Sequence, residues 1–305
     1  MGGLLTDSSG WRAVFWVNIP AGLLLLIAIR LVIPPSVTER AARVDVVGAL
    51  VLIASVMALI VGASLAEDPA RRVTGGILVA AGTGLGAAFA MQQRRAADPL
   101  VPRAAQASAN LRTGTAVSFV NTATTSSAGV LATLAMQQQF GISAVRAGLL
   151  LLPFSLGVIA GSALYTPLLP RLTTRRLAAV GLAGIAAGDL LLALTYGSIA
   201  GIVAGVIVAG TGLGIASVAA NAIGTDVDGS LQGTASGVLN TGAQLGTALG
   251  VAGLLVLAVM LDRPWPGTAL AWTVAAALAA LAALTLVVRD LSSRRGRTAA
   301  AAARR

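Results

Sequence analysis

One acidic side chain, Asp189, lies well inside a long apolar stretch of this sequence, and it is the only ionisable residue placed in this way. A charged side chain at the centre of a membrane-spanning helix costs roughly 2.5–3.5 kcal/mol on insertion scales, so such residues are rare and usually functional. We therefore expect Asp189 either to carry protons or to have a structural role near the outer surface, where Arg146 is available as an ion-pair partner.

A second group of polar residues lies inside the apolar stretch 113–137. It consists of one amide and five hydroxyl side chains: Asn121, Thr122, Thr124, Thr125, Ser126 and Ser127. Short hydroxyls can donate to the carbonyl four residues earlier, so they are tolerated in lipid and often bend the helix. The amide of Asn121 needs partners of its own. The run therefore indicates either a bent packing helix or the wall of a polar cavity.

The residue inventory argues against most enzymatic chemistry. The sequence has no histidine and no cysteine, which removes the commonest general base and all thiol chemistry. A magnesium-dependent prenyl transferase needs two Asp-rich motifs, whereas only Asp226 and Asp228 come near such a motif. The GTGLG segments at 82–86 and 210–214 lie inside apolar stretches without a preceding strand, so they indicate helix packing and not a nucleotide loop. We expect no enzyme activity, no metal and no cofactor.

These polar residues occur among nine apolar stretches, each about as long as a bilayer crossing. A hydrocarbon core roughly 30 Å thick needs about 20 apolar residues in a helix. Charged residues are only 10% of the chain, too few to solvate a large soluble domain. The pattern predicts an all-α polytopic membrane protein with nine transmembrane helices. The predicted spans are 14–33, 46–66, 74–92, 113–137, 147–168, 177–196, 199–221, 233–259 and 268–288.

The arginines predict how the chain is oriented in the membrane. All 21 basic residues are arginine and most lie in loops, so the net charge of +10 follows the positive-inside pattern and does not indicate a nucleic-acid partner. A cytoplasmic C-terminus leaves sixteen arginines inside and five outside, and the opposite orientation reverses this ratio. We therefore predict an outside N-terminus and a cytoplasmic C-terminus. The tryptophans are expected at or near the outer membrane interface: Trp11, Trp16, Trp265 and Trp272.

Gly242, Gly246 and Gly250 recur at four-residue spacing in the span 233–259 and leave one face of that helix nearly bare. Such a face lets the backbone of another helix approach closely. The pattern indicates either static packing or a sliding interface, because glycine contacts lack interlocking side chains.

The first residues, MGGLLTDSSGWRAVFWVNIPAG, resemble the end of the fifth helix and the start of the sixth in 14-span drug:proton antiporters of the major facilitator superfamily. The matching positions are Gly2, Gly3, Trp11, Arg12, Phe15, Asn18, Pro20 and Gly22. ADPLVPRAAQASANLR and QQQFGISAVRAGLLLLPFSLG resemble the approaches to the ninth and tenth helices, and GTASGVLNTGAQLGTALGVA resembles the thirteenth. The resemblance implies a partial major facilitator fold, helices six to fourteen, that lacks the first five helices.

The resemblance also implies how the chain is divided. Residues 1–36 would hold the end of helix five and helix six of the N-terminal half, and 37–112 two linking transmembrane helices. Residues 113–291 would form the six-helix C-terminal half, and 292–305 a disordered basic cytoplasmic tail. Gly2 and Gly3 would belong to an antiporter motif. The span 233–259 would face the missing half, which favours the sliding interpretation of its glycines.

A cytoplasmic gating loop is implied after the span 147–168. The stretch reads GSALYTPLLPRLTTRR, in which Arg171, Arg175 and Arg176 stand at the basic positions of the family pattern. Pro170 stands where the family carries an acid, and Thr173 replaces a glycine. A charge relay therefore lacks its acidic partner within this loop.

The implied function is proton-coupled export of amphipathic drugs or antibiotics across the plasma membrane by alternating access, as part of a longer protein. The implied partners are the lipid bilayer, protons, a small amphipathic substrate and the missing N-terminal helices, in the same or another chain. Two alternatives stay open: a non-transporting truncated remnant, and a membrane subunit that requires a second polypeptide. The helices at 113–137 and 199–221 would line the central cavity with these candidates: Asn121, Thr125, Gln137, Thr211, Ser217 and Asn221.

Overall fold

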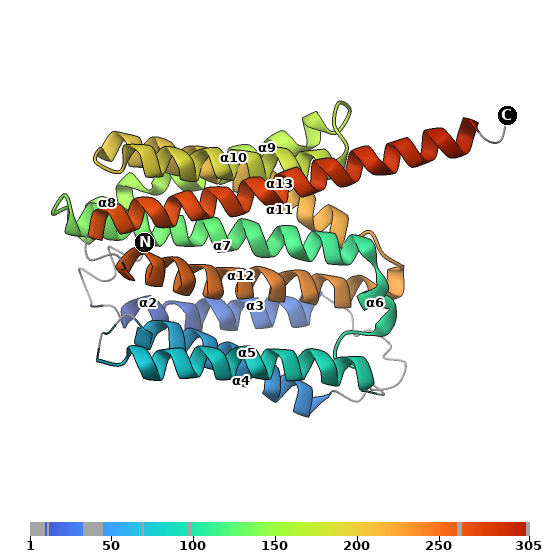
Figure 1. The fold of residues 1–305 in the computed structure, drawn as a ribbon, viewed down its shortest axis with the longest axis horizontal. Coiled ribbons are helices and arrows are strands. Elements are labelled where there is room, and N and C mark those ends of the chain that lie inside the picture. The colour runs from blue at the N-terminus through green and yellow to red at the C-terminus, as the bar shows by residue number, and fades with distance from the viewer. Residues whose placement is uncertain are drawn as a thin grey trace.

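The computed structural model describes residues 10, 12–32, 45–66, 68, 70–96, 99–260 and 264–302, and every element within those ranges is a helix (Figure 1). The α-helices are α2 (Ala13–Trp16), α3 (Asn18–Val32), α4 (Val46–Ala66), α5 (Arg72–Arg95), α6 (Arg103–Ala107), α7 (Ala109–Gln138), α8 (Ala144–Leu150), α9 (Leu152–Leu168), α10 (Thr174–Thr195), α11 (Ile199–Gly224), α12 (Gln232–Met260) and α13 (Pro264–Ala302). A 3-10 turn, η1 (Gly229–Leu231), precedes α12.

The helices agree with the predicted spans. Seven helical segments within the described ranges are long and apolar enough to cross a bilayer, and α8 and α9 together form one of them. α3 is apolar but has only 15 residues. α7 has 30 residues, but its polar side chains lower its hydropathy. The all-α polytopic membrane class is confirmed, with a helix count close to nine.

Serine and threonine caps determine where several helices begin. Ser108 Oγ accepts a hydrogen bond from Leu111 N at 3.1 Å at the start of α7. Thr173 and Ser198 cap α10 and α11 through backbone N–H groups three residues later. Each cap satisfies one of the first backbone N–H groups, which have no partner within the helix.

A turn at a glycine connects α7 to α8, and a break beside a proline separates α8 from α9. Pro153 lies in the first turn of α9, just after the break at Leu151, where a missing N–H costs no helical hydrogen bond. Gly141 follows α7 with φ of +62°, a left-handed conformation that glycine adopts without steric cost. The two turns let α8 and α9 cross the membrane together as one broken span.

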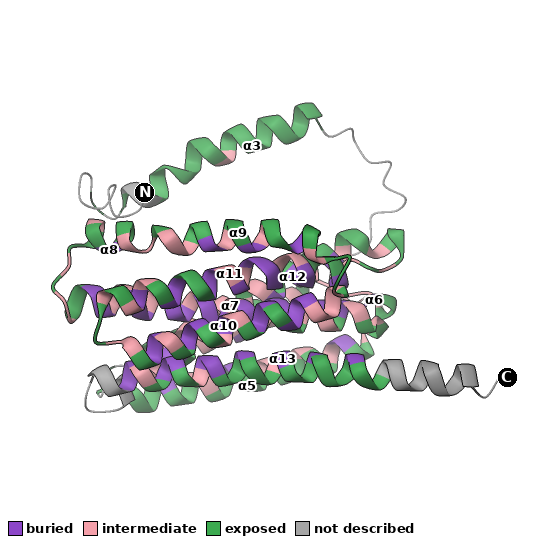
Figure 2. Ribbon diagram, turned by 90° about the horizontal axis from the view of Figure 1, so that it is seen from above, coloured by how far each residue is buried: buried purple, intermediate pink, exposed green. Residues whose placement is uncertain are grey.

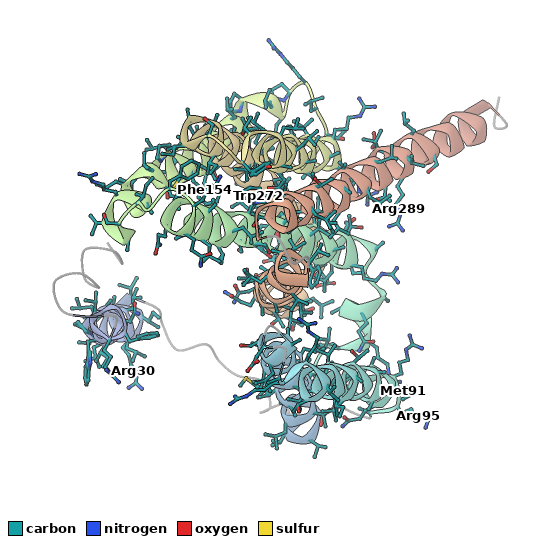
Figure 3. All side chains as sticks on the ribbon, turned by 60° about the vertical axis from the view of Figure 1, so that its left-hand side comes forward. Arg30, Met91, Arg95, Phe154, Trp272 and Arg289 are labelled. Atoms are coloured by element: carbon teal, nitrogen blue, oxygen red, sulfur yellow. The ribbon has the colours of Figure 1, made fainter. Side chains whose placement is uncertain are left out.

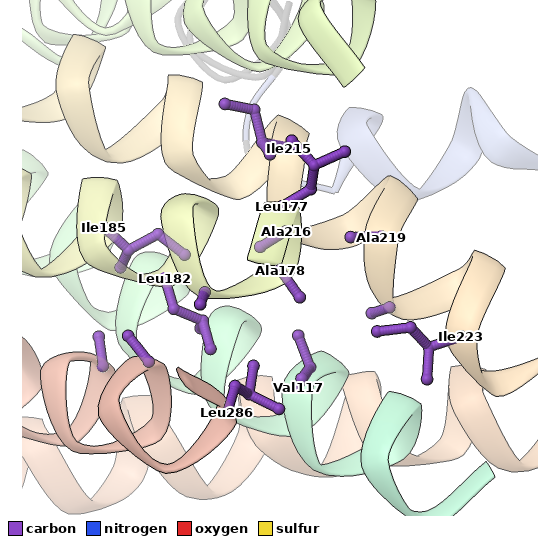
Figure 4. Close-up of a cluster of buried hydrophobic side chains, with 14 of the residues drawn as sticks. Val117, Leu177, Ala178, Leu182, Ile185, Ile215, Ala216, Ala219, Ile223 and Leu286 are labelled. Carbon is purple, nitrogen blue, oxygen red and sulfur yellow. The ribbon is translucent and has the colours of Figure 1, made fainter. Parts of the chain in front are cut away.

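Two apolar clusters hold α7, α10, α11 and α13 together. The first includes Leu177, Leu182 and Leu286 (Figure 4), and the second, towards the other end of the bundle, includes Met136 and Trp272. Buried residues concentrate in these helices, as Figure 2 shows in purple. Because lipid is as apolar as these side chains, the clusters stabilise the fold mainly by close packing.

α4 and α5 form an antiparallel hairpin in which glycines bring the two backbones together. A Cβ at Gly62 would lie 2.8 Å from the backbone of α5, and one at Gly75 2.6 Å from that of α4. Ser55 Oγ donates to Gly82 O at 2.7 Å across the same interface. α4 also contacts α12, whereas α3 lies apart from the bundle in Figure 2 and has no buried residue.

Two expectations are wrong. α13 continues to Ala302, so most of the tail predicted to be disordered at 292–305 is helical, because alanine, the strongest helix former, dominates its end. At about 1.5 Å per residue the helix is roughly 58 Å long and extends beyond a 30 Å hydrocarbon core (Figure 1). Trp272 is fully buried and not interfacial, because the second apolar cluster is rich in alanine and leaves space for its ring.

Gly242, Gly246 and Gly250 of α12 all face α7. A Cβ at Gly246 would overlap the carbonyl oxygen of Phe119 and lie 2.5 Å from Thr122 Oγ1. That hydroxyl donates to a carbonyl of α12 at 2.7 Å. The glycine face of α12 is therefore covered by α7 of the same chain, and the sliding interpretation stays a prediction. The missing side chains let α7 and α12 approach closely enough to share a hydrogen bond.

Gly246→Ala should destabilise the protein by about 1–3 kcal/mol, because its Cβ meets the backbone of α7 and forces the helices apart. Gly253→Ala on the same helix is the control, since nothing lies within 4 Å of a Cβ there. That change should be neutral or stabilising by up to about 1 kcal/mol, because alanine favours helix. Thermal unfolding of the purified protein in detergent compares the two, and equal midpoints would contradict the packing described.

Candidate functional site

The buried amide of Asn121 on α7 binds Ser217 on α11. Asn121 is 1% exposed, and its Nδ2 donates to Ser217 Oγ at 3.2 Å. Its Oδ1 is buried and has no hydrogen-bond partner within the described residues. An unpaired buried acceptor costs roughly 1–3 kcal/mol. The Oδ1 atom is therefore suited to accept a hydrogen bond from a group that enters between the two helices.

Thr125 and Asn221 extend this pair along the two helices. Thr125 is buried and its Oγ1 donates to Asn121 O at 2.5 Å. Asn221 is exposed and its Nδ2 donates to Ser217 O at 2.9 Å. The structure thus brings together four of the six cavity candidates, which we call the amide cluster: Asn121, Thr125, Ser217 and Asn221.

Gln137 and Thr211 do not belong to the amide cluster. Gln137 is exposed near the end of α7, roughly 18 Å along the helix from Thr125. Thr211 Oγ1 donates to a carbonyl of its own helix at 2.9 Å, and its backbone packs against Gly157 and Gly161 of α9. The face of α11 that carries Thr211 could not be distinguished from the face that carries Ser217 by sequence, because small or apolar residues occupy nearly every position of that helix.

Asp189 is fully buried on α10, and neither carboxylate oxygen has a hydrogen-bond partner within the described ranges. The expected pairing with Arg146 does not occur, since Arg146 is exposed in the first turn of α8. A buried carboxyl group without a partner is rare inside membrane helices and marks a functional candidate.

Two adjacent arginines at the start of α10 bind polar partners from other helices. Arg176 Nε lies 2.9 Å from Asp290 Oδ2 of α13, and the Asp290 side chain is 9% exposed. Arg175 Nη2 donates to Asn110 Oδ1 at 2.9 Å, and Asn110 Nδ2 donates to Asp226 Oδ2 at 2.9 Å. These five residues form what we call the charged cluster. It connects the starts of α7 and α10 with the end of α11 and with α13.

The charged cluster contains two acids, Asp226 and Asp290, whereas the predicted gating loop has Pro170 at its acidic position. A cavity of about 830 Å³ lies beside it, lined by Asn110, Arg175 and both acids. Arg171 is exposed and stays outside the cluster. Asp290 was not predicted as a site residue, although Asp290 directly follows the last predicted span, on the membrane side where most arginines were placed. Asp226 was considered only as a metal ligand.

Two further expectations bear on this site. Gly2 and Gly3, the predicted antiporter-motif glycines, lie outside the described residues. Among the residues that the structure describes, no group of three acidic side chains is placed to hold a metal ion. The polar side chains described at these two clusters are therefore amides, hydroxyls, carboxylates and guanidinium groups.

A sequence model of the Major Facilitator Superfamily matches residues 114–305, from the first turns of α7 to the end of the chain. This chain belongs to the Major Facilitator Superfamily, a family of membrane transporters and not of enzymes. The matched region contains the whole amide cluster and Asp189. The resemblance to the superfamily is confirmed, while the 14-span arrangement stays a prediction.

Several relatives carry names of antibiotic transport or resistance. The probable actinorhodin transporter of Streptomyces coelicolor is 30% identical over 265 residues, which cover 82% of this chain and 46% of the relative. The lincomycin resistance protein of Streptomyces lincolnensis is 32% identical over 260 residues, 83% of this chain and 53% of the relative. The puromycin resistance protein pur8 of Streptomyces alboniger is 32% identical over 271 residues, with 82% and 51% covered. The chain spans about half the length of the curated relatives it matches.

A double-mutant cycle with Arg176→Gln and Asp290→Asn should give a coupling of about 0.5–3 kcal/mol in the free energy of unfolding, because the carboxylate is nearly buried. Arg71→Gln with Asp68→Asn is the matched control. That pair is 3.6 Å apart and its side chains are 67% and 51% exposed, so its coupling should stay below about 1 kcal/mol. Denaturant unfolding in detergent micelles measures both cycles. A coupling no larger for Arg176 and Asp290 than for the control pair would count against a closing role for the charged cluster.

Proposed function

We propose that this chain is part of a proton-coupled transporter that exports amphipathic drugs, antibiotics among them, across the plasma membrane. The observation that carries the proposal is the buried pair of Asn121 and Ser217, which supplies hydrogen-bonding groups between two helices of a largely apolar bundle. The relatives named for actinorhodin, lincomycin and puromycin support an antibiotic as cargo. The excess of arginines on one side supports a cytoplasmic C-terminus.

In this proposal α7 and α11 form one wall of a substrate site near the middle of the membrane. An amphipathic molecule would pack its apolar part on the surrounding alanine, glycine and leucine residues and direct its polar groups to the amide cluster. Asn121 Oδ1, which has no partner within the described residues, would accept a hydrogen bond from the substrate. Alternating access would then need a second group of helices that rocks against this wall.

The charged cluster would be the cytoplasmic gate of this site. Its bonds join four helices at one end of the bundle, so they would form when that end closes and break when it opens. Separating Arg176 from Asp290 removes a guanidinium from a nearly buried carboxylate, which is unfavourable. The gate would therefore have two distinct states and not a continuous range of positions.

Asp189 would carry the coupled proton. Its full burial and its lack of a hydrogen-bond partner within the described residues support this role. The alternative is a structural role in the packing of α10. The two roles differ in what the isosteric amide does: asparagine fills the same space but cannot exchange a proton.

Two alternatives to the proposed transporter stay open. Alternating access requires two halves, and the relatives are about twice as long as the matched region. The alternatives are a membrane subunit that requires a second polypeptide and a remnant that does not transport.

An efflux assay separates these readings. Vesicles containing the chain alone, or the chain with a polypeptide that carries the first helices of a relative, are loaded with a fluorescent amphipathic cation. Gradient-dependent export, lost on adding an uncoupler, is expected when both halves are present. Export by the chain alone would remove the need for a second polypeptide, and no export in either case would overturn the proposed function.

In that assay Asn121→Ala should reduce export about tenfold or more at equal protein level, because it removes the buried amide of the site. Thr273→Val is the control, since the Thr273 hydroxyl is exposed and donates to a carbonyl of its own helix. Unchanged export by Asn121→Ala would contradict the assignment of α7 and α11 as the substrate wall.

Asp189→Asn should abolish export driven by a proton gradient while leaving folding and facilitated substrate exchange intact. Asp68→Asn, in an exposed loop, is the control and should transport normally. Transport rates measured from about pH 5.5 to pH 8 report on coupling. If Asp189→Asn retains gradient-driven export across this range, proton coupling by Asp189 is wrong and the structural role stands.

A further inference from the structure

A groove between α7 and α13 lies outside the site described above. At the end of the bundle that carries the charged cluster it forms a cavity of about 520 Å³. Its walls are mostly apolar, with Val117 and Val120 on α7 facing Ala282 and Leu286 on α13. The groove exists because α13 diverges from α7 and α12 towards its C-terminal end (Figure 1).

A second cavity lies farther along α7 and α13, towards the other end of the bundle. It has a volume of about 410 Å³ and is lined by side chains of α7, α12 and α13. On α7 its lining begins at Phe119, beside Val120 of the first cavity, and on α13 it begins at Leu278, one turn before Ala282. From Arg289 to Val274 the two cavities extend roughly 22 Å along α13. This length exceeds half of a hydrocarbon core that is roughly 30 Å thick.

Two arginines lie at the end of the groove that is nearest the charged cluster. Arg112 and Arg289 both line the first cavity, and no carboxylate lines it with them. Within the described residues neither guanidinium has an ion pair or a hydrogen bond, in contrast to Arg175 and Arg176 of the charged cluster. Figure 3 labels Arg289 on α13, on the side of the bundle where α5 carries Arg95.

The other polar side chains of the first cavity are already satisfied. Thr113 Oγ1 donates to Ala109 O at 2.7 Å, and Thr285 Oγ1 donates to Ala282 O at 2.7 Å. The groove therefore offers two unpaired cationic donors at the membrane surface and an apolar wall from there to mid-membrane. An occupant that complements it has an anionic head and a long hydrocarbon chain.

We propose that this groove binds one anionic phospholipid of the leaflet facing the arginine-rich end. The phosphate group accepts charge-assisted hydrogen bonds from Arg112 and Arg289, and one acyl chain lies between α7 and α13 towards Leu254 and Val274. A soluble anion would leave the apolar wall unused, and a neutral lipid would leave the paired arginines unused. The inference depends on insertion of the chain in a bilayer and not on the proposed transport.

The test compares binding of phosphatidylglycerol and phosphatidylcholine with identical acyl chains to the purified full chain by native mass spectrometry. The wild type should retain one phosphatidylglycerol about tenfold more tightly than phosphatidylcholine. Arg112→Gln with Arg289→Gln should remove that preference. Arg94→Gln with Arg95→Gln should retain it, since these exposed arginines on α5 lie outside the groove and change the net charge equally.

A second variant tests the apolar wall. Ala116 is exposed and lines the groove, so the larger side chain of Ala116→Phe should block the part that binds the acyl chain. Binding of phosphatidylglycerol should become about tenfold weaker, although both arginines stay in place. Glycerol 3-phosphate, which has the anionic head without the chains, should not compete. A wild type without preference, an equal loss in the α5 control, no effect of Ala116→Phe, or full competition by glycerol 3-phosphate would each overturn the proposal.

Discussion

The structure depends on the close approach of helix backbones at glycine. In hydrocarbon, helices gain nothing by hiding apolar side chains from lipid, so they associate through tight packing and hydrogen bonds between helices. Glycines provide this approach at the α4–α5, α7–α12, α9–α11 and α10–α11 interfaces. At two of these interfaces a hydroxyl also donates to a carbonyl on the neighbouring helix, Ser55 to Gly82 between α4 and α5 and Thr122 to α12 from α7. Polar residues are tolerated inside this bundle because bare helix faces give them partners.

The same constraint places charged and neutral polar clusters at different depths along the bundle. α7 contributes to both polar clusters, and fourteen of its thirty residues are buried. Near the membrane surface Asn110 takes part in a network with full charges, where water and headgroups solvate whatever the protein leaves unpaired. Three turns further along, Asn121 takes part in a neutral network of amides and hydroxyls. Asp189 is the exception, because it places a carboxyl group in the apolar interior with no partner among the described residues.

The spans were predictable because the membrane imposes a length on each helix, and α4 begins and ends at the predicted residues, 46 and 66. Both members of the Asn121–Ser217 pair were predicted as site candidates, because an amide and a hydroxyl stand out in apolar helices. Their contact depends on how α7 and α11 rotate against each other, which only packing decides, and Thr211 lies outside the amide cluster. The bond between Arg176 and Asp290 joins residues 114 positions apart and has no local pattern. The groove beside Arg112 was equally unpredictable, since it follows from the direction in which α13 diverges.

That separation along the chain has a consequence for biosynthesis. Asp290 is translated 114 residues after Arg176, which takes roughly 6–23 s at about 5–20 residues per second. For most of this interval α10 is already made, while the carboxylate that will bind its second arginine does not yet exist. The charged cluster of the nascent bundle therefore stays incomplete until α13 has been made.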